Sequence, residues 1–354
     1  MKIRFGFGEL GNLGLAALYG FVYIFAAWQG GKFAQRHGCR RSLVIGFTGI
    51  AASMTAGLVW HSPLGQVLTL TGWTISVCFI WPALEAIVTE GDGVNLSDMV
   101  GFYNITWALG GAVAYFFGGM LLERLGMQSL FWLPLCMVGA QLLLLPLAVH
   151  LTHRDTKAMP EPSAAPSPVP AGSRHFLHLA WLSNPLAYVA INTTIPLIPS
   201  ISVKLGLSTA AAGILCSLWM FARLGAFVFL WRWTWWHYHF RILALSFVVM
   251  VASFGGIVLA TSVLMLLVAQ IGFGLSVGLI YYSSLYYSMN ASDERGAHGG
   301  LHEAMIGAGL FLGPACGAFS ILILPAVAGA GVASVGGLLA VGFSGLLVMR
   351  RRQK

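Results

Sequence analysis

The sequence predicts an all-α protein, a polytopic transmembrane helical bundle with two pseudo-symmetric halves of five and six helices. Three observations lead to this prediction. Apolar residues make up 58% of the 354 positions and charged residues only 8%, whereas about a quarter of a water-soluble domain is charged. The few charges lie between long apolar runs, and the two parts of the chain resemble each other at an offset of about 200 residues.

The apolar runs have the length that a helix needs to cross a bilayer, about 20 residues. They are apolar on every side, as in residues 130–147, and do not alternate as the strands of a membrane barrel do. They predict eleven helices at about residues 10–34, 42–60, 64–88, 99–122, 128–149, 176–200, 208–231, 242–260, 262–289, 299–322 and 328–349.

The formal net charge of +8 does not indicate nucleic-acid binding, because Lys and Arg are spread between the helices and form no single patch. The five cysteines show no C-x-x-C spacing and lie mostly inside apolar runs. No nucleic-acid partner, no cofactor and no metal site are therefore expected.

The basic residues predict how the helices are oriented. Lys and Arg gather in the loops after the odd-numbered predicted helices and at the C-terminus, while the other loops hold only Arg124 and Lys204. Basic loops resist translocation, so the first set is expected in the cytoplasm. The expectation is a multi-pass protein of a bacterial-type inner membrane, with the lipid bilayer as a partner, a cytoplasmic C-terminus and a monomeric state.

A proline-rich segment divides the chain. Residues 154–173 carry five prolines among Ala and Ser, a composition typical of an extended tether that cannot pack. The predicted organisation is an N-terminal helical half at 1–153, a cytoplasmic linker at 154–174 and a C-terminal six-helix half at 175–354.

An internal repeat relates the two halves. A shift of 200 residues places Arg41 on Arg241 and Gly72 on Gly272, and a shift of 199 places Gly101, Gly110 and Gly118 on Gly300, Gly309 and Gly317. A parallel repeat of this kind is typical of transporters with two six-helix halves. The helix at 176–200 then has no counterpart, and the interpretation is that its partner would precede Met1.

The loop after the first predicted helix reads Gly31-Lys32-Phe33-Ala34-Gln35-Arg36-His37-Gly38-Cys39-Arg40-Arg41. It resembles the G-x-x-x-D-R-x-G signature loop of the major facilitator superfamily. The resemblance rests on Gly31, Gln35, Arg36, Gly38, Arg40 and Arg41. In that family the loop joins the second and third of twelve helices, which implies that the first helix is absent here. Gln35 stands where the family has an acidic residue. A neutral amide at this position departs from the charge-relay role that the resemblance implies for the loop.

The tenth predicted helix carries Gly309-x-x-x-Gly313-Pro314-x-x-Gly317. This pattern is similar to a glycine-proline motif that drug/proton antiporters of the family carry in their first half. The matching first-half helix of this chain lacks the proline, so the antiporter subclass is not implied. Small residues at this spacing favour close helix packing over a gating element.

Ionisable residues inside membrane helices are costly unless they face a cavity or a partner. The candidates are Glu85, Arg223, His302 and Glu303. Glu85 and Glu303 are hypothesised to form a cytoplasmic gate or to be protonated during transport, with His302 adjusting the local charge. The alternative is that the carboxyls reach interfacial water. Arg223 is hypothesised to bind an anionic substrate group or to pair with a carboxylate such as Glu303.

Aromatic and amide residues on the helices expected to form the cavity are softer candidates. The strongest are Asn104, Trp107, Tyr188, Asn192, Trp219 and Tyr282, and the others are Trp73, Trp81, Asn184, Gln270, Tyr281 and Tyr286. Rings and amides suit an amphipathic or aromatic ligand, although they also pack helices. Adjacent tyrosines differ by about 100 degrees around a helix, so no more than half of the tyrosines at 281–287 can line a pore.

The function that these features predict is secondary active transport of an unidentified small molecule by alternating access, with coupling to protons left open. The chain has no G-x-x-x-x-G-K phosphate-binding loop and is not expected to be an enzyme. A truncated or degenerate transporter without activity is an alternative. An integral-membrane enzyme acting on lipid-linked substrates is less favoured, because the acidic residues form no catalytic constellation.

Overall fold

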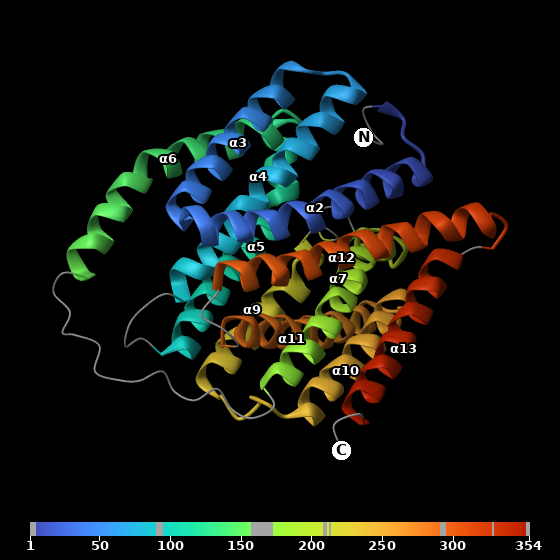
Figure 1. Cartoon of the computed structure of the whole chain (residues 1–354). Coiled ribbons are helices and arrows are strands. Elements are labelled where there is room, and N and C mark those ends of the chain that lie inside the picture. The colour runs from blue at the N-terminus through green and yellow to red at the C-terminus, as the bar shows by residue number, and fades with distance from the viewer. Residues whose placement is uncertain are drawn as a thin grey trace.

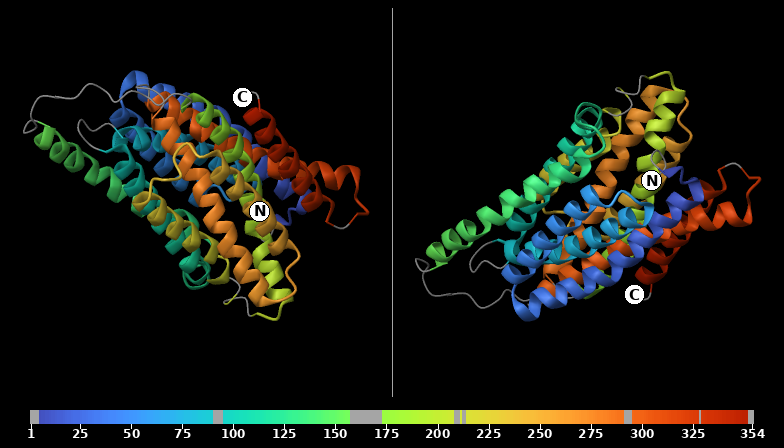
Figure 2. Two further views of the ribbon diagram at one scale, coloured as in Figure 1. Left: turned by 90° about the horizontal axis from the view of Figure 1, so that it is seen from below. Right: turned by 90° about the horizontal axis from the view of Figure 1, so that it is seen from above.

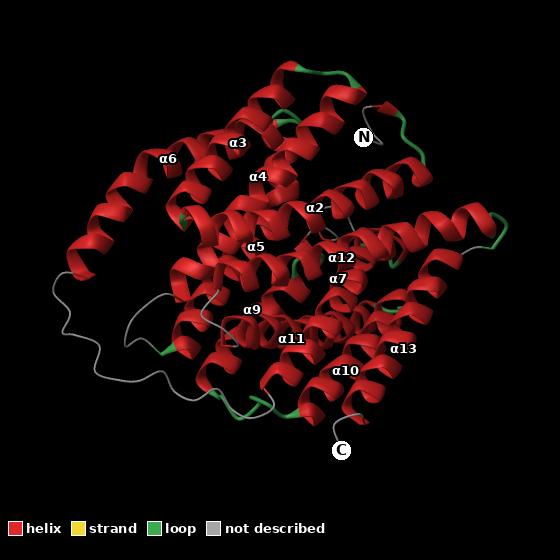
Figure 3. Ribbon diagram, viewed as in Figure 1, coloured by secondary structure: helices red, strands yellow, loops and turns green. Residues whose placement is uncertain are grey.

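A computed structural model describes residues 5–89, 95–156, 173–207, 211, 214–290, 295–327 and 329–351 (Figure 1). Every regular element in these ranges is a helix, and they contain no strand (Figure 3). Most of the predicted linker lies outside the described residues, and so do residues 1–4.

The structure has eleven long helices in its described part, in agreement with the predicted all-α fold. They are α2 (Glu9–His37), α3 (Cys39–Val59), α4 (Pro63–Thr89), α5 (Leu96–Leu125), α6 (Ser129–Thr156), α7 (Ser173–Lys204), α9 (Leu218–Arg232), α10 (Phe240–Val258), α11 (Val263–Asn290), α12 (Arg295–Ile323) and α13 (Ala330–Arg351). Nine of them are long and apolar enough to cross a membrane, α7 and α9 being the exceptions among the described ranges.

The helices α2–α6 and α7–α13 form two groups around a shared centre. Within the first group α3 packs on α4 and α6, and within the second α10 packs on α11 and α7 packs on α10, α11, α12 and α13. Figure 2, from below and from above, shows α6 and α13 in different parts of the molecule. One buried apolar cluster contains residues of both groups, among them Tyr23, Tyr103, Phe227 and Tyr281. The centre of the molecule therefore lies between the two groups.

The internal repeat is visible as a repeated contact. A side chain at Gly72 of α4 would come within 2.7 Å of Oγ of Ser53 in α3, and one at Gly272 of α11 would come within 2.6 Å of Oγ of Ser253 in α10. Each pair is related to the other by the predicted offset of 200 residues. The small glycine at the same place in both groups therefore lets an equivalent pair of helices approach closely.

A seam of small residues joins the two groups along α2 and α12, which run side by side in Figure 1. Gly300 of α12 faces Gly31 and Ala27 of α2, so closely that a methyl group on Gly300 would lie 2.7 Å from Cα of Gly31. Further along, Gly307 of α12 lies against the backbone of Ile24. Backbones can approach this closely only where neither helix carries a side chain.

The seam makes a first prediction. Replacing Gly300 by Val should lower the free energy of unfolding by about 1–3 kcal/mol or more, because backbone atoms of α2 occupy the space that the new side chain needs. The same substitution at Gly110 is a matched control, since nothing lies within 4 Å of a methyl group there. Thermal unfolding in detergent measures both variants. Equal stability of the two would contradict a close α2–α12 seam.

A second contact between the groups runs along α5 and α9. The indole Nε1 of Trp231 in α9 donates a hydrogen bond to Oδ1 of Asp98 in α5 over 2.9 Å. The ring of Trp231 also packs over Gly101, which leaves no room for a side chain there. The two groups of helices are thus held by contacts on both sides of the shared centre.

The ends of α2, α10 and α13 define one face of the bundle, which we call the basic face. The helix α2 ends at this face and α3 begins there with Arg40 and Arg41, while α10 begins there with Arg241 and α13 ends there with Arg350. The loops at 60–62 and 259–262 lie at the opposite face.

The connection between α9 and α10 carries a half-buried histidine, His237, outside the membrane-spanning helices. The His237 ring stacks on Tyr286 with the two ring centroids 4.1 Å apart and lies against Trp236. Burial lowers the pKa of His237 from its usual value of 6.5 to about 4. The ring is therefore neutral at pH 7.

This histidine predicts a pH effect on stability. Because its pKa is lower in the folded state, the unfolded chain binds the proton more readily, and stability is lost as pH falls from about 6.5 towards 4. Replacing His237 by Phe should reduce the loss, measured as the fall of the unfolding midpoint in detergent across that range. The exposed His61, replaced by Phe, is the control. An identical pH dependence in all three proteins would contradict the burial of a neutral His237.

Candidate functional site

A central cavity of about 180 Å³ lies between the two groups of helices. The first group lines it from α2, α4 and α5, and the second from α7, α11 and α12. The lining residues are Tyr19, Tyr23, Trp81, Tyr103, Trp107, Tyr188, Tyr281, Glu303, Ile306 and Leu310. We call this cavity the central chamber.

Three ionisable side chains meet at the wall of the chamber. One carboxylate oxygen each of Glu85 and Glu303 and one ring nitrogen of His302 lie within 4.8 Å of one another. Glu85 comes from α4 and the other two residues from α12. Nε2 of His302 lies 3.9 Å from Oε1 of Glu85. All three residues are buried, at 1%, 0% and 4% exposure, so the alternative that the carboxyls reach interfacial water is wrong.

Only part of this cluster has hydrogen-bond partners. The Tyr23 hydroxyl of α2 donates to Oε2 of Glu303, and Nδ1 of His302 lies 2.9 Å from Oγ of Ser284 in α11. Both carboxyl oxygens of Glu85 and Nε2 of His302 have no hydrogen-bond partner among the described residues. Unsatisfied buried polar atoms are costly, so these atoms are free to take up a proton, water or a ligand.

Two carboxyl groups at this separation resist being ionised together in a buried site unless a positive charge lies beside them, because the repulsion between them is large. A single proton shared between Glu85 and Glu303 removes that repulsion. The spacing of the cluster alone would also admit a metal ion. A shared proton accounts for the repulsion without an ion, and the Tyr23 hydroxyl already occupies one oxygen of Glu303.

Arg223 lies next to the chamber but does not line it. Its guanidinium is 4.7 Å from the ring centroids of both Trp107 and Tyr281 and 5.8 Å from that of Tyr188, and these three rings do line the chamber. Nε and Nη2 of Arg223 have no hydrogen-bond partner in the described part of the chain, and no carboxylate there lies within salt-bridge distance. Arg223 and Glu303 form no ion pair in this conformation, and their pairing during a movement of the two groups stays a prediction.

Tyr281 connects the guanidinium to the acidic cluster. Its ring lies 4.7 Å from Arg223 on one side and 5.2 Å from the His302 ring, measured between centroids, on the other. Arg223 is thus a fixed positive charge one aromatic ring away from the cluster.

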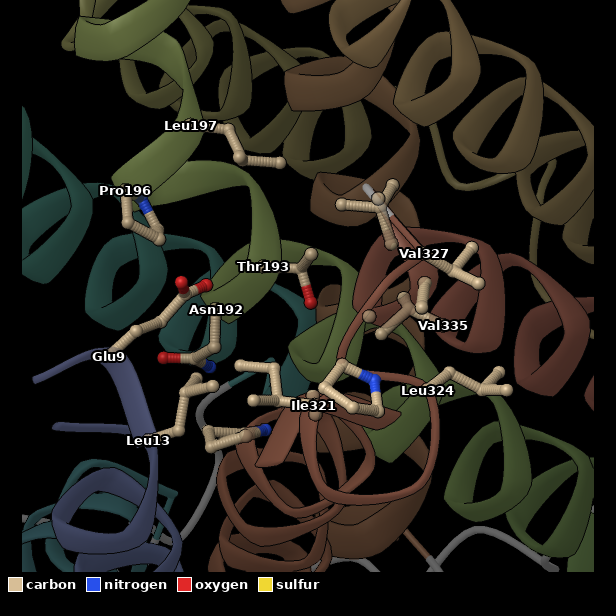
Figure 4. A pocket seen from close by; sticks show the side chains of 18 residues that line it. Glu9, Leu13, Asn192, Thr193, Pro196, Leu197, Ile321, Leu324, Val327 and Val335 are labelled. Atoms are coloured by element: carbon tan, nitrogen blue, oxygen red, sulfur yellow. The ribbon is translucent and has the colours of Figure 1, made fainter. Parts of the chain in front are cut away.

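A larger cavity of about 370 Å³ lies towards the opposite face, between α2, α7, α12 and α13. Figure 4 shows Glu9 and Asn192 on one side of it and the aliphatic side chains of Ile321, Leu324 and Val335 on others. Glu9 is exposed, and this cavity contains no cluster of ionisable groups from the two groups of helices. We therefore assign the chemistry to the smaller central chamber.

The softer aromatic and amide candidates divide between the chamber and other places. Trp107 and Tyr188 line the chamber, and Asn104 accepts a hydrogen bond from the Trp107 indole over 3.2 Å. Asn192 lines the larger cavity. Trp219 packs against Tyr115 and Phe273 away from the chamber.

The two neighbouring tyrosines of α11 point in different directions. Tyr281 lines the chamber, while Tyr282 packs against Phe227 and Trp236. Of this pair, only Tyr281 can therefore meet a bound molecule in the chamber, as the helical geometry requires.

The signature loop lies at the basic face, where α2 ends and α3 begins. Gly38 adopts a positive φ of 91°, which lets the chain turn directly from one helix into the next. Arg36, Arg40 and Arg41 are exposed. Gln35 accepts a hydrogen bond over 3.0 Å from the backbone N–H of Gly296, at the start of α12. A neutral amide thus contacts a helix N-terminus.

The glycine-proline motif of α12 is a packing surface. Gly309 lies against Pro185 and Tyr188 of α7, and Gly313 lies against Val189. Pro314 and Gly317 line the larger cavity next to them. This is the close helix packing that the spacing of small residues favoured.

Three chamber tyrosines were missed by reasoning from the sequence: Tyr19, Tyr23 and Tyr103. Tyr19 and Tyr23 are four residues apart on α2 and thus share one face of the helix. That spacing, on a helix otherwise rich in aliphatic residues, is the signal that could have identified them.

Comparisons with known proteins agree with the fold. The Major Facilitator Superfamily profile matches residues 5–314. The crystal structure of the human organic anion transporter MFSD10 (TETRAN) superimposes with a TM-score of 0.70 at 15% identity, covering 96% of this chain and 84% of that one. The transporter FucP in the outward conformation superimposes with a TM-score of 0.63 at 16% identity, covering 96% and 89%.

No curated protein sequence matches the chain. The two structural likenesses, at 15% and 16% identity, show the fold alone. The profile match covers most of the chain, from α2 into α12, and includes the signature loop. The chain therefore belongs to the major facilitator superfamily, a family of membrane transporters.

Proposed function

We propose that this protein is a secondary active transporter that moves a small molecule by alternating access and is coupled to protons. In this proposal residues 1–153 and 175–354 are the two moving halves and residues 154–174 link them. The protein works as a monomer in a bacterial-type inner membrane, and the basic face, with the C-terminus, lies in the cytoplasm because of its arginines.

The observation that carries the proposal is the acidic cluster at the contact between the two halves. Glu85 and Tyr23 belong to the first half, and His302 and Glu303 belong to the second. A relative movement of the halves changes how the Glu303 carboxyl lies against the Tyr23 hydroxyl and against Glu85. The free energy of protonating the cluster is therefore linked to the conformation of the protein.

The chamber also has the position that alternating access requires. It lies between the two halves, next to both lines of contact, the α2–α12 seam and the α5–α9 contact. Rocking of the halves about these contacts would open it to one face and then to the other.

A cysteine in the chamber tests alternating access without knowledge of the substrate. Leu310 lines the chamber, and Leu310→Cys should react with a membrane-impermeant maleimide added to either face of oriented vesicles. Reaction from one face only, at every pH tested, would contradict the proposal. Leu143→Cys is the control, because Leu143 is 82% exposed on the outside of α6, where lipid should protect it from a hydrophilic reagent.

A further inference from the structure

The central chamber has the wall chemistry of a site for a positively charged molecule. Seven of the ten residues that line it are Tyr or Trp, and Glu303 is the one charged residue among the ten. The face of an aromatic ring carries partial negative charge and attracts cations. A cage of rings with a carboxylate at its wall is an arrangement that recognises organic ammonium groups.

The position of Arg223 does not favour an anionic ligand in this chamber. An anion there would meet the ring faces of Trp107 and Tyr281, since the guanidinium packs against these rings and is not part of the lining. Arg223 instead supplies a fixed positive charge near the acidic cluster, which balances a negative charge on Glu85 or Glu303.

Counting charges links the ligand to the proton. With one proton shared by Glu85 and Glu303 and His302 neutral, the single negative charge of the carboxyl pair cancels the charge of Arg223. A monovalent cation would add one positive charge to this neutral site. Loss of the shared proton restores neutrality, and uncompensated charge in a site of low dielectric constant is costly.

We propose that the central chamber binds a small organic cation and releases one proton from the Glu85–Glu303 pair for each cation bound. This inference rests on the proposed transport function and deepens it, since it makes the protein an exchanger of an organic cation against a proton. The cavity of about 180 Å³ is below the range of about 300–1,000 Å³ that is usual for drug-sized ligands, so the cation is small.

The groups that face the cluster and could take or give a proton come from six helices. Tyr19 and Tyr23 lie on α2, and Cys78 and Glu85 on α4. Tyr103 lies on α5, Tyr188 on α7, Arg223 on α9 and Tyr281 on α11. The phenols and the thiol are neutral at pH 7 in their ordinary state, so the exchanged proton belongs to the carboxyl pair.

The test uses the purified full-length protein and three probes. Choline is the cation, 3,3-dimethylbutan-1-ol is its uncharged isostere, and benzoate is a flat anion. Isothermal titration at pH 7 in buffers of different ionisation enthalpy measures both binding and the number of protons released. Choline should bind with release of about one proton, and the uncharged isostere should bind at least about tenfold more weakly.

Two matched variants locate the site. Glu303→Gln keeps the size of the side chain and removes its charge, and it should weaken choline binding by about tenfold or more and abolish proton release. Glu9→Gln removes a carboxylate from the larger cavity and should leave both measurements unchanged. Circular dichroism and gel filtration verify that each variant is folded.

Equal binding of choline and its uncharged isostere would overturn the inference, as would benzoate binding that is lost in Arg223→Gln. Unchanged choline binding in Glu303→Gln would overturn it too. Binding of choline with release of one proton, but without choline uptake into proteoliposomes, would support the cation site and contradict the proposed transport function, so the two proposals can fail separately.

Discussion

Replacing Glu303 by Gln is expected to abolish proton coupling and at the same time to stabilise the folded protein. Glu303 shares a buried site with Glu85, and an uncharged amide removes the need for a bound proton to offset the repulsion between the two carboxyls while keeping a partner for Tyr23. Replacing buried ionic groups by neutral ones is often neutral or stabilising by about 1–4 kcal/mol. Loss of function with a gain in stability is typical of a functional site.

Two measurements on one preparation check this prediction. Proton movement in proteoliposomes, followed with a pH-sensitive dye after addition of choline, should fall to the level of empty liposomes. Thermal unfolding in detergent should occur at the same or a higher temperature than in the wild-type protein. Glu123→Gln, at an exposed position on α5, is the control and should change neither the proton movement nor the unfolding temperature. A destabilised Glu303→Gln variant with intact proton movement would mean that the cluster is structural.

Replacing Arg223 by Gln is expected to shift the pH profile of transport to higher pH. Without the positive charge next to Tyr281, the carboxyl pair holds its proton more tightly, and more alkaline conditions are needed to release it. The shift should be smaller than the roughly 1–3 units that a charge within about 4–6 Å produces, because the Tyr281 ring lies between the guanidinium and the cluster. Arg223→Lys keeps the charge, although it loses the planar contact with the rings, and should stay close to the wild-type profile.

The pH profile separates this role from a direct contact with the substrate. If Arg223 bound an anionic substrate, its replacement would weaken substrate binding at every pH and leave the pH profile of transport unshifted. The ratio of choline-driven proton movement between the variant and the wild type, measured across the pH range, therefore decides between the two roles. An unshifted profile in Arg223→Gln would contradict the assignment of Arg223 as the balancing charge.

The helices and the repeat could be predicted from the sequence because each depends on local patterns. An apolar run of bilayer length has few alternatives to a helix, and the offset between Gly72 and Gly272 is a property of the sequence itself. The bounds of α9 could not be predicted, since the apolar run at 208–231 extends further towards the N-terminus than the helix that begins at Leu218. Apolar composition does not specify where a helix begins.

The acidic cluster could be predicted in part. Glu85, His302 and Glu303 were identified because ionisable residues in apolar helices are rare. That they meet one another depends on the packing of α4 against α12, and the partner Tyr23 depends on the α2–α12 seam. Contacts of this kind join residues more than 200 positions apart, and no local pattern specifies them.

The aromatic candidates show where composition misleads. Trp219 and Tyr282 have the same residue types as Trp107 and Tyr281, but they face other helices, because the rotation of each helix decides which ring meets the chamber. Arg223 was predicted to contact a ligand directly. The structure places rings of the chamber wall against its guanidinium, and we propose that it acts as a balancing charge and not as a ligand contact.

We propose that a proton on the Glu85–Glu303 pair controls which face of the transporter is open, and pulsed electron–electron double resonance can measure the opening of each face. Spin labels at Arg40 and Arg241 report on the basic face, and labels at His61 and Ser262 report on the opposite face, after the five native cysteines have been replaced. We expect that lowering the pH from about 8 to about 5.5 moves the two distances in opposite directions in the wild type and moves neither in Glu303→Gln. Distances that do not change with pH in the wild type, or that change equally in the variant, would contradict it.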